Sequence, residues 1–159
     1  MAEYVSGEEL SAIRLNKNRA FLSGIKVVNS GGQAFPQASA TIVEFDNEWY
    51  DLGSEFDPAT YKFTANKDGY YSVQGGLGIS NGATASAFQV RIIKNAGQMS
   101  NFHFQFTSTA KLMSVPFMDT IVLSAGDTIE IRVYVTSSSS FVMSGGIGTH
   151  LEIRMIYEL

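Results

Sequence analysis

The sequence predicts an all-β protein built as a two-sheet antiparallel sandwich. The 15 glycines, 12% aromatic residues and only 16% charged residues among 159 residues fit tight turns and strands better than a helical bundle. Several runs alternate apolar and polar residues with period two, as residues 102–106 do. Turn signals recur about every 8 to 12 residues, which predicts roughly eight to ten short strands and, more specifically, a jelly roll.

The N-terminal region carries the one helical pattern in the chain. Ser6 and Glu9 form a capping box, and apolar residues follow at helical spacing, so one short helix is expected within residues 6–19. Because such a helix is marginal alone, we interpret residues 1–32 as an attachment arm that orders against a partner or a neighbouring subunit, with a frayed terminus as the alternative. The candidate contact residues of this arm are Tyr4, Leu10 and Ile13.

Residues 33–159 form the predicted sandwich domain. Asp57-Pro58 marks a corner, and Asp68-Gly69 is a turn signal between aromatic runs, so the strands on either side of it are expected to be consecutive elements of one sheet system. Pro116 predicts an edge strand or a bulge. The expected strands are residues 21–28, 41–45, 61–65, 70–79, 88–93, 102–106, 111–123, 129–135 and 151–157.

Several predicted strands carry apolar side chains on both faces. A monomer does not normally leave that much apolar surface in water, so the pattern favours a symmetric oligomer. The residues expected to lie between subunits are Tyr70, Ile93, Leu112, Met118, Tyr134 and Ile156.

The stretch from Tyr50 to Val73 resembles the core signature of the C1q and tumour-necrosis-factor-like jelly-roll domains. A Tyr-Asp pair in a loop leads into a pattern that Thr60, Phe63, Gly69 and either Tyr70 or Tyr71 match. Two positions depart from the family pattern, namely Tyr61 in place of Gly and Asn66 in place of Pro.

The resemblance continues downstream, through RIIKN at residues 91–95, the Gly-Asp turn at 126–127 and the stretch 141–151, and it covers roughly residues 34–159. It implies a homotrimer packed around a threefold axis. C1q-like modules of this kind occur in bacteriophage virions.

Motifs for catalysis or metal binding are weak. Gly78 to Gly82 matches a nucleophile-elbow pattern around Ser80, but no helix-like segment follows it, so no catalytic residue is assigned. His103 and His150 are interpreted as ordinary strand or trimer-axis residues. Calcium is a conceivable ligand of one acidic loop region, although a solvated loop is favoured and no cofactor is expected. The carboxylates of this region are Asp46, Glu48, Asp51, Glu55 and Asp57.

The composition of the chain excludes several classes of partner and of chemistry. A net charge of -4 gives no basic field for nucleic acid, and the absence of cysteine excludes disulfides and a cysteine nucleophile. No apolar run is long enough for membrane insertion, and MAEYVSGEEL does not look like a secretory signal, so synthesis in a host cytoplasm is expected.

The expected function is that of a non-enzymatic structural protein of a phage virion. In this interpretation a homotrimer decorates the particle as a head fibre, decoration protein or fibre tip, and its arm holds a capsid or tail protein. The alternative is a module that recognises a host-surface receptor or glycan through its apical loops. An esterase centred on Ser80 is the third class considered.

Overall fold

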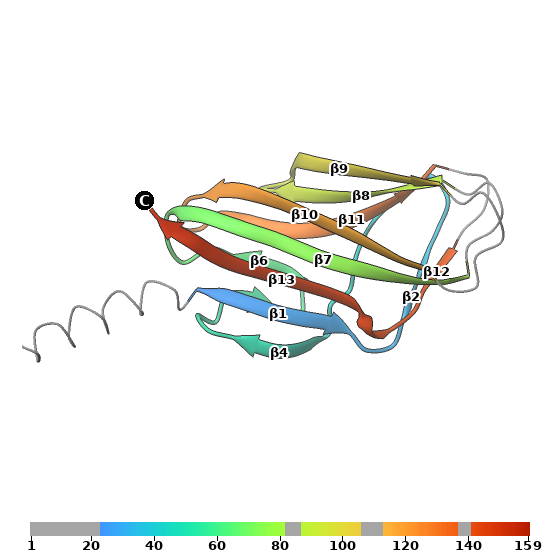
Figure 1. Ribbon diagram of the computed structural model, residues 1–159, viewed down its shortest axis with the longest axis horizontal. Helices are drawn as coiled ribbons and strands as arrows, with labels where there is room; N and C mark the ends of the chain where they lie inside the picture. The colour runs from blue at the N-terminus through green and yellow to red at the C-terminus, as the bar shows by residue number, and fades with distance from the viewer. Residues whose placement is uncertain (1–22, 82–86, 106–112, 137–140) are drawn as a thin grey trace, which may run out of the picture.

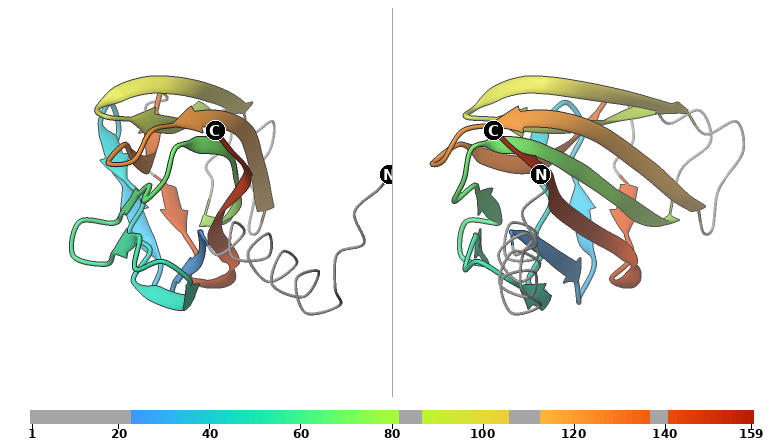
Figure 2. Two further views of the ribbon diagram at one scale, coloured as in Figure 1. Left: turned by 90° about the vertical axis from the view of Figure 1, so that its left-hand side faces the viewer. Right: turned by 60° about the vertical axis from the view of Figure 1, so that its left-hand side comes forward.

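The computed structural model describes residues 23–81, 87–105, 113–136 and 141–159, and this part of the chain is all-β. Two antiparallel sheets stack face to face, as Figure 1 and the end-on view in Figure 2 show. The predicted two-sheet sandwich is therefore confirmed. The helix expected at residues 6–19 lies outside the described residues.

One sheet, called the first sheet here, is organised around its long central strands. Its order is β2 (Gln33–Phe35), β12 (Phe141–Met143), β7 (Gly69–Asn81), β13 (Gly146–Glu158), β1 (Gly24–Asn29) and β4 (Asn47–Asp51), while β10 (Met113–Leu123) pairs with β7.

The other sheet, called the second sheet, packs across the core from the first. Its order is β5 (Phe56–Asp57), β6 (Lys62–Thr64), β11 (Thr128–Val135), β8 (Ala87–Lys94) and β9 (Gly97–Gln105), while β3 (Ala40–Ile42) pairs with β11.

The core lies between the sheets and follows the predicted alternation. On β7 the inward side chains of Tyr71, Val73, Leu77 and Ile79 are fully buried. Gly75 belongs to the same face, where a Cβ atom would lie 2.4 Å from the His150 carbonyl oxygen and 2.5 Å from the Phe117 ring. Glycine at this position therefore leaves the space that the Phe117 ring fills.

The boundary of the predicted arm needs correction. Residues 24–29, assigned to the arm in the sequence analysis, form β1, which lies inside the first sheet between β13 and β4. Ile25 and Val27 on this strand are fully buried. The sandwich thus begins by Ser23, because the apolar side chains of β1 belong to its core.

The Asp68-Gly69 turn also differs from expectation. It joins β6 of the second sheet to β7 of the first, so the two strands are not neighbours in one sheet. Gly69 is required for a different reason than a hairpin turn, because a Cβ atom there would lie 2.4 Å from the Tyr157 carbonyl oxygen. The chain therefore passes close to the end of β13 as it changes sheets.

Strand β10 confirms the edge-strand alternative for Pro116. It pairs with β7 in an unbroken register from Met113 to Leu123, and Pro116 stands opposite Gly76 without a bulge. Proline lacks the N–H that a second neighbour would need, so it protects this edge from further pairing. In the described part of the chain, no helix is long and apolar enough to cross a membrane.

Both ends of the sandwich domain meet at one pole. The Met155 N–H donates to the Ser23 carbonyl at 3.2 Å, and the Leu159 N–H donates to the Asp68 carbonyl at 3.1 Å. Strand β7 runs from this pole, at Gly69, to the opposite pole, at Asn81 (Figure 1).

Candidate assembly surface

The outer face of the first sheet carries a cluster of exposed apolar side chains. Val122 on β10, Tyr70 on β7 and Tyr157 on β13 stand in one row across three strands. The Tyr70 and Tyr157 rings pack edge to face with their centroids 6.2 Å apart. We call Tyr70, Val122, Ile156 and Tyr157 the apolar patch; their exposed fractions are 40%, 45%, 48% and 64%.

A bulge in β13 completes this patch. Leu151, Ile153 and Met155 point into the core, so strict alternation would also turn Tyr157 inward. The register with β7 shifts between Met155 and Tyr157, which leaves Ile156 as the extra residue. Both Ile156 and Tyr157 therefore face solvent in the single chain.

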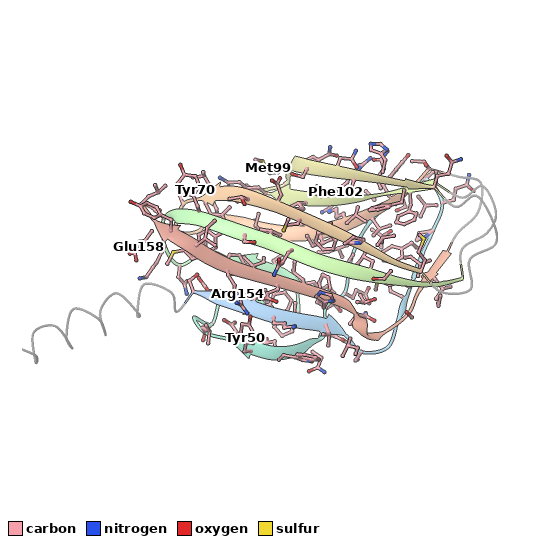
Figure 3. The ribbon with its side chains drawn as sticks, in the orientation of Figure 1. Tyr50, Tyr70, Met99, Phe102, Arg154 and Glu158 are labelled. Atoms are coloured by element: carbon pink, nitrogen blue, oxygen red, sulfur yellow. The ribbon has the colours of Figure 1, made fainter. Side chains whose placement is uncertain are left out.

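The same face becomes polar towards β1 and β4. The Arg154 guanidinium donates to the Tyr50 hydroxyl from Nε at 3.2 Å and from Nη2 at 3.0 Å, and it pairs with Glu152. The Tyr50 hydrogen bond and then the Glu152 charge raise the pKa of Arg154 above its ordinary value. Lys26 lies over the exposed Trp49 ring, 4.9 Å from its centroid. Figure 3 shows Tyr50 on β4 and Arg154 on β13, two strands of this sheet that are separated by β1.

A pocket opens at the end of this polar half. Its described lining consists of Ser23, Tyr50, Leu52 and Arg154, and the Leu52 side chain is half exposed. The outer face of the first sheet thus combines three features. These are the apolar patch, the region where Lys26 and Arg154 contact Trp49 and Tyr50, and the pocket beside β1, β4 and β13.

A second apolar surface lies at the side of the sandwich, where edge strands β9 and β10 approach each other. The Phe102 and Phe117 rings bridge the two sheets with centroids 6.3 Å apart, and the Ser100 hydroxyl donates to Asp119. Met99 and Met118 are 53% and 67% exposed. Figure 3 places Met99 and Phe102 along this edge, away from Tyr50. We call this region the β9–β10 edge.

The predicted interface residues divide between the two sheets. Tyr70, Met118 and Ile156 lie exposed on the first sheet, whereas Tyr134 and Ile93 lie on the outer face of the second. Leu112 lies outside the described residues, as do the arm residues Tyr4, Leu10 and Ile13.

Ile93 is not the exposed side chain that the sequence predicts. It is only 7% exposed within its own chain. Sequence reasoning also missed Val122 and Tyr157. For Val122 the signal was present, since it alternates with the buried Ile121 and Leu123.

Ser80 does not stand on a nucleophile elbow. It lies within strand β7, and its hydroxyl donates to the Val142 carbonyl at 3.1 Å. His150 pairs in register with Gly76, four residues away along β7, which separates it from Ser80 by about 13 Å. His103 belongs to β9 in the other sheet. The described structure therefore brings no base to this serine.

The acidic residues of the 46–57 region stabilise their own turns. Asp51 accepts hydrogen bonds from the backbone N–H groups of Gly53, Glu55 and Phe56. Buried Glu55 accepts from the Ser23 hydroxyl at 2.7 Å. No group of three or more potential ligands that could hold a metal ion occurs among the described residues.

Two carboxylates of this region have lowered pKa values. The Ser30 hydroxyl, which donates to Asp46 at 2.6 Å, lowers the pKa of that carboxyl. The Thr60 hydroxyl, which donates at 2.7 Å, does the same for the pKa of Asp57. Both groups are therefore held as anions by local hydrogen bonds.

The carboxyl group of Asp127, at the pole where the two ends of the sandwich domain meet, has a strongly lowered pKa. Lys94 Nζ lies 2.8 Å from its Oδ2 atom, and the Ser124 N–H and the Asn95 amide also donate to it. The Lys94 hydrogen bond first, and then these donors, lower the pKa of Asp127 to about 2. This network joins β8 to the turn before β11.

These features describe a two-sheet jelly-roll domain whose first sheet carries an apolar patch on its outer face. The model of the C1q domain family matches residues 26–148, and the chain belongs to that family. No curated protein matches the chain in sequence.

Several solved structures have the same fold as this chain. The globular domain of zebrafish complement 1qA superposes with a TM-score of 0.64 at 15% identity, covering 86% of this chain and 98% of that one. Eiger TNF from S. frugiperda gives a TM-score of 0.62 at 10% identity, covering 86% and 94%. Murine APRIL gives a TM-score of 0.62 at 13% identity, covering 84% of this chain and 98% of that one. The C1q/TNF-like jelly roll predicted from the sequence is thereby confirmed.

One departure from the family pattern has a visible structural counterpart. Tyr61, which stands where glycine is usual, has a positive φ of 58°. This left-handed conformation costs a non-glycine residue roughly 1 kcal/mol or more. The Tyr61 side chain packs against the core, and this contact offsets the strain.

Proposed function

We propose that this protein is a non-enzymatic structural module that assembles as a homotrimer through the outer face of its first sheet. The observation that carries the proposal is the apolar patch. Four large side chains, each 40–64% exposed, gather at one end of this face. The outer face of the second sheet instead carries hydrogen-bonded polar and charged side chains, such as Gln89 and Arg91.

A threefold ring requires two different surfaces on each subunit. Because the contacts around such a ring run head to tail, the surface that one copy offers must fit another surface of the next copy. The first sheet supplies a broad face, and the β9–β10 edge supplies a ridge with exposed Met99 and Met118. Methionine side chains adapt readily to irregular apolar surfaces. We infer that the edge of one subunit packs on the face of the next.

Mass and directed crosslinking test this arrangement. Light scattering should report three copies of the 17.3 kDa chain. Since the sequence has no cysteine, single Met99→Cys and Tyr157→Cys chains can be refolded together and oxidised. A disulfide between the two different chains is expected. A monomer in solution, or mixtures that form only disulfides between identical chains, would contradict edge-to-face packing.

We further propose that the trimer decorates a virus particle, bound through the segment before Ser23. The arm now comprises residues 1–22, which include the predicted capping box and helical pattern. Three arms entering at one pole of a trimer multiply weak single contacts by avidity. The support is this combination of a trimer-forming module with a short N-terminal segment.

Deletion of residues 1–22 separates attachment from assembly. The shortened chain should still form trimers but should no longer co-purify with capsid or tail protein. If the shortened trimer still binds particles, the arm is not the attachment element. If the full-length trimer binds host cells and particles assemble normally without it, receptor recognition replaces decoration as the function.

A further inference from the structure

Two methionine side chains differ in exposure from the other methionines of the described structure. Met143 and Met155 are buried, with exposed fractions of 0% and 4%, and Met113 packs against the core. Met99 and Met118 are instead 53% and 67% exposed, although methionine is among the residue types most often found inside a protein. Both exposed methionines lie on the β9–β10 edge.

Backbone geometry turns both of these side chains outward. The register of β9 with β8 shifts between Ile92 and Ile93, which leaves Met99 as the extra residue of a bulge, without a partner across the ladder. Met118 lies on β10, an edge strand of the first sheet, and it alternates with the buried Phe117. The exposure of both methionines therefore follows from the strands that carry them.

A hydrogen bond joins the two strands at these methionines. Ser100, which follows Met99, donates its hydroxyl to the carboxylate of Asp119, which follows Met118. This contact links the edge strand of one sheet to the edge strand of the other. Figure 3 shows Met99 at this edge. The two thioether groups therefore belong to one surface, to which both sheets contribute.

Exposed thioether groups react with peroxides. Hydrogen peroxide transfers one oxygen atom to the methionine sulfur, its O–O bond breaks, and the second oxygen leaves as water. The sulfur loses two electrons and becomes a sulfoxide, which is polar and chiral. Because the oxidant must reach the sulfur atom, we expect the two edge methionines to react while Met143 and Met155 are shielded.

We propose that Met99 and Met118 form an oxidation site whose sulfoxides prevent single chains from assembling. The inference rests on the trimer proposed above, in which this edge packs on the first sheet of the next subunit. An oxidised edge would bring a polar S=O group against Val122 and Ile156, whose hydrocarbon side chains offer no hydrogen-bond donor. Because the next subunit covers both sulfur atoms in the trimer, the reaction takes place on unassembled chains, and assembly protects against it.

Peptide mass spectrometry after treatment with hydrogen peroxide tests the reactivity. In Ile156→Asp, which places a charge in the apolar patch to keep the chain single, the two edge methionines should oxidise roughly tenfold faster than Met143 and Met155. In the wild-type trimer the rates at Met99 and Met118 should fall by roughly the same factor. Equal rates at all four methionines in the single chain would overturn the oxidation site.

Paired substitutions test the effect on assembly without an oxidant. Glutamine carries a polar amide near the position of the sulfur, whereas leucine keeps the side chain apolar and has no sulfur to oxidise. Met99→Gln with Met118→Gln should raise the chain concentration at which half of the chains are trimeric by roughly tenfold or more in light scattering. Met99→Leu with Met118→Leu is the matched control, which should assemble like the wild type and stay trimeric in peroxide. Circular dichroism should match the wild type in both pairs, because these side chains are exposed in the single chain.

The outcomes separate the oxidation site from the trimer on which it rests. A wild type that stays monomeric at every concentration refutes the trimer, and the oxidation site fails with it. If the wild type is trimeric, the oxidation site alone is overturned when the glutamine pair assembles equally well, or when peroxide dissociates the leucine pair as readily as the wild type. Loss of wild-type trimers in step with sulfoxide formation at Met99 and Met118 is the result expected.

Discussion

Replacing Ile156 with aspartate should dissociate the trimer and leave the sandwich folded. Ile156 is 48% exposed in the single chain, so about half of the side chain remains for a neighbouring subunit to cover. Full burial of such a side chain contributes roughly 1.5–3 kcal/mol, so the exposed half contributes about 1 kcal/mol per subunit. An unpaired carboxylate buried in its place adds a desolvation penalty of several kcal/mol per subunit. Over three subunits the loss is on the order of 10 kcal/mol, or about seven orders of magnitude in the association constant.

Light scattering on the purified variant measures this effect. The wild type should show the mass of a trimer, and Ile156→Asp should show that of one chain, with an unchanged circular dichroism spectrum. Thr64→Asp is the matched control, because Thr64 is exposed on the second sheet. A trimeric Ile156→Asp protein, or equal dissociation of both variants, would refute the assignment of the first sheet as the assembly surface.

Three further substitutions test the fold and the site. Gly75→Ala should lower the free energy of unfolding by about 1–3 kcal/mol in denaturant titrations, because the added methyl group overlaps the Phe117 ring and a carbonyl oxygen. Gly148→Ala is the control and should cost less, because the nearest atom to its added methyl group is 4.0 Å away. Equal losses in the two variants would argue against this close packing. Asp127→Asn should lower the free energy of unfolding at neutral pH. This loss relative to the wild type should shrink as the pH falls from 3.8 towards about 2, because protonation of Asp127 removes the stabilisation that its depressed pKa reflects. A loss of stability that does not depend on pH would contradict the ion pair. Ser80→Ala should leave any hydrolysis by the preparation unchanged, whereas a loss of hydrolysis in a folded variant would revive the esterase interpretation.

The sequence could predict which side chains of a strand point inward and which point outward, but it could not predict which of the two sheets each strand joins. Alternation correctly placed Val73 and Leu77 in the core and Tyr70 and Met118 outside it. It could not separate Tyr134 from Met118, because each strand has an inner and an outer face whichever sheet it joins. Which outer face is apolar depends on long-range pairing, which single-strand patterns do not encode.

The remaining differences come from local backbone geometry. The bulge at Ile156 reverses the parity of Tyr157, and one added residue leaves no periodic signal in so short a segment. Glycine in the Asp68-Gly69 turn suggested a hairpin, although its role is the close approach of the chain to Tyr157. Similarly, the break at residues 29–32 suggested the end of an arm, whereas it ends the first strand of the core.

The meeting of both ends of the sandwich domain at one pole has a practical consequence for display. Strand β7 extends 13 residues from Gly69 to Asn81, which places the far pole about 40 Å away. If the arms attach the trimer as proposed, a tag joined after Leu159 would lie near Ser23, where each arm begins, and would compete with the arms for space at their partner. The far pole would stay unobstructed, so cargo meant to face outward belongs in a loop there and not at either terminus.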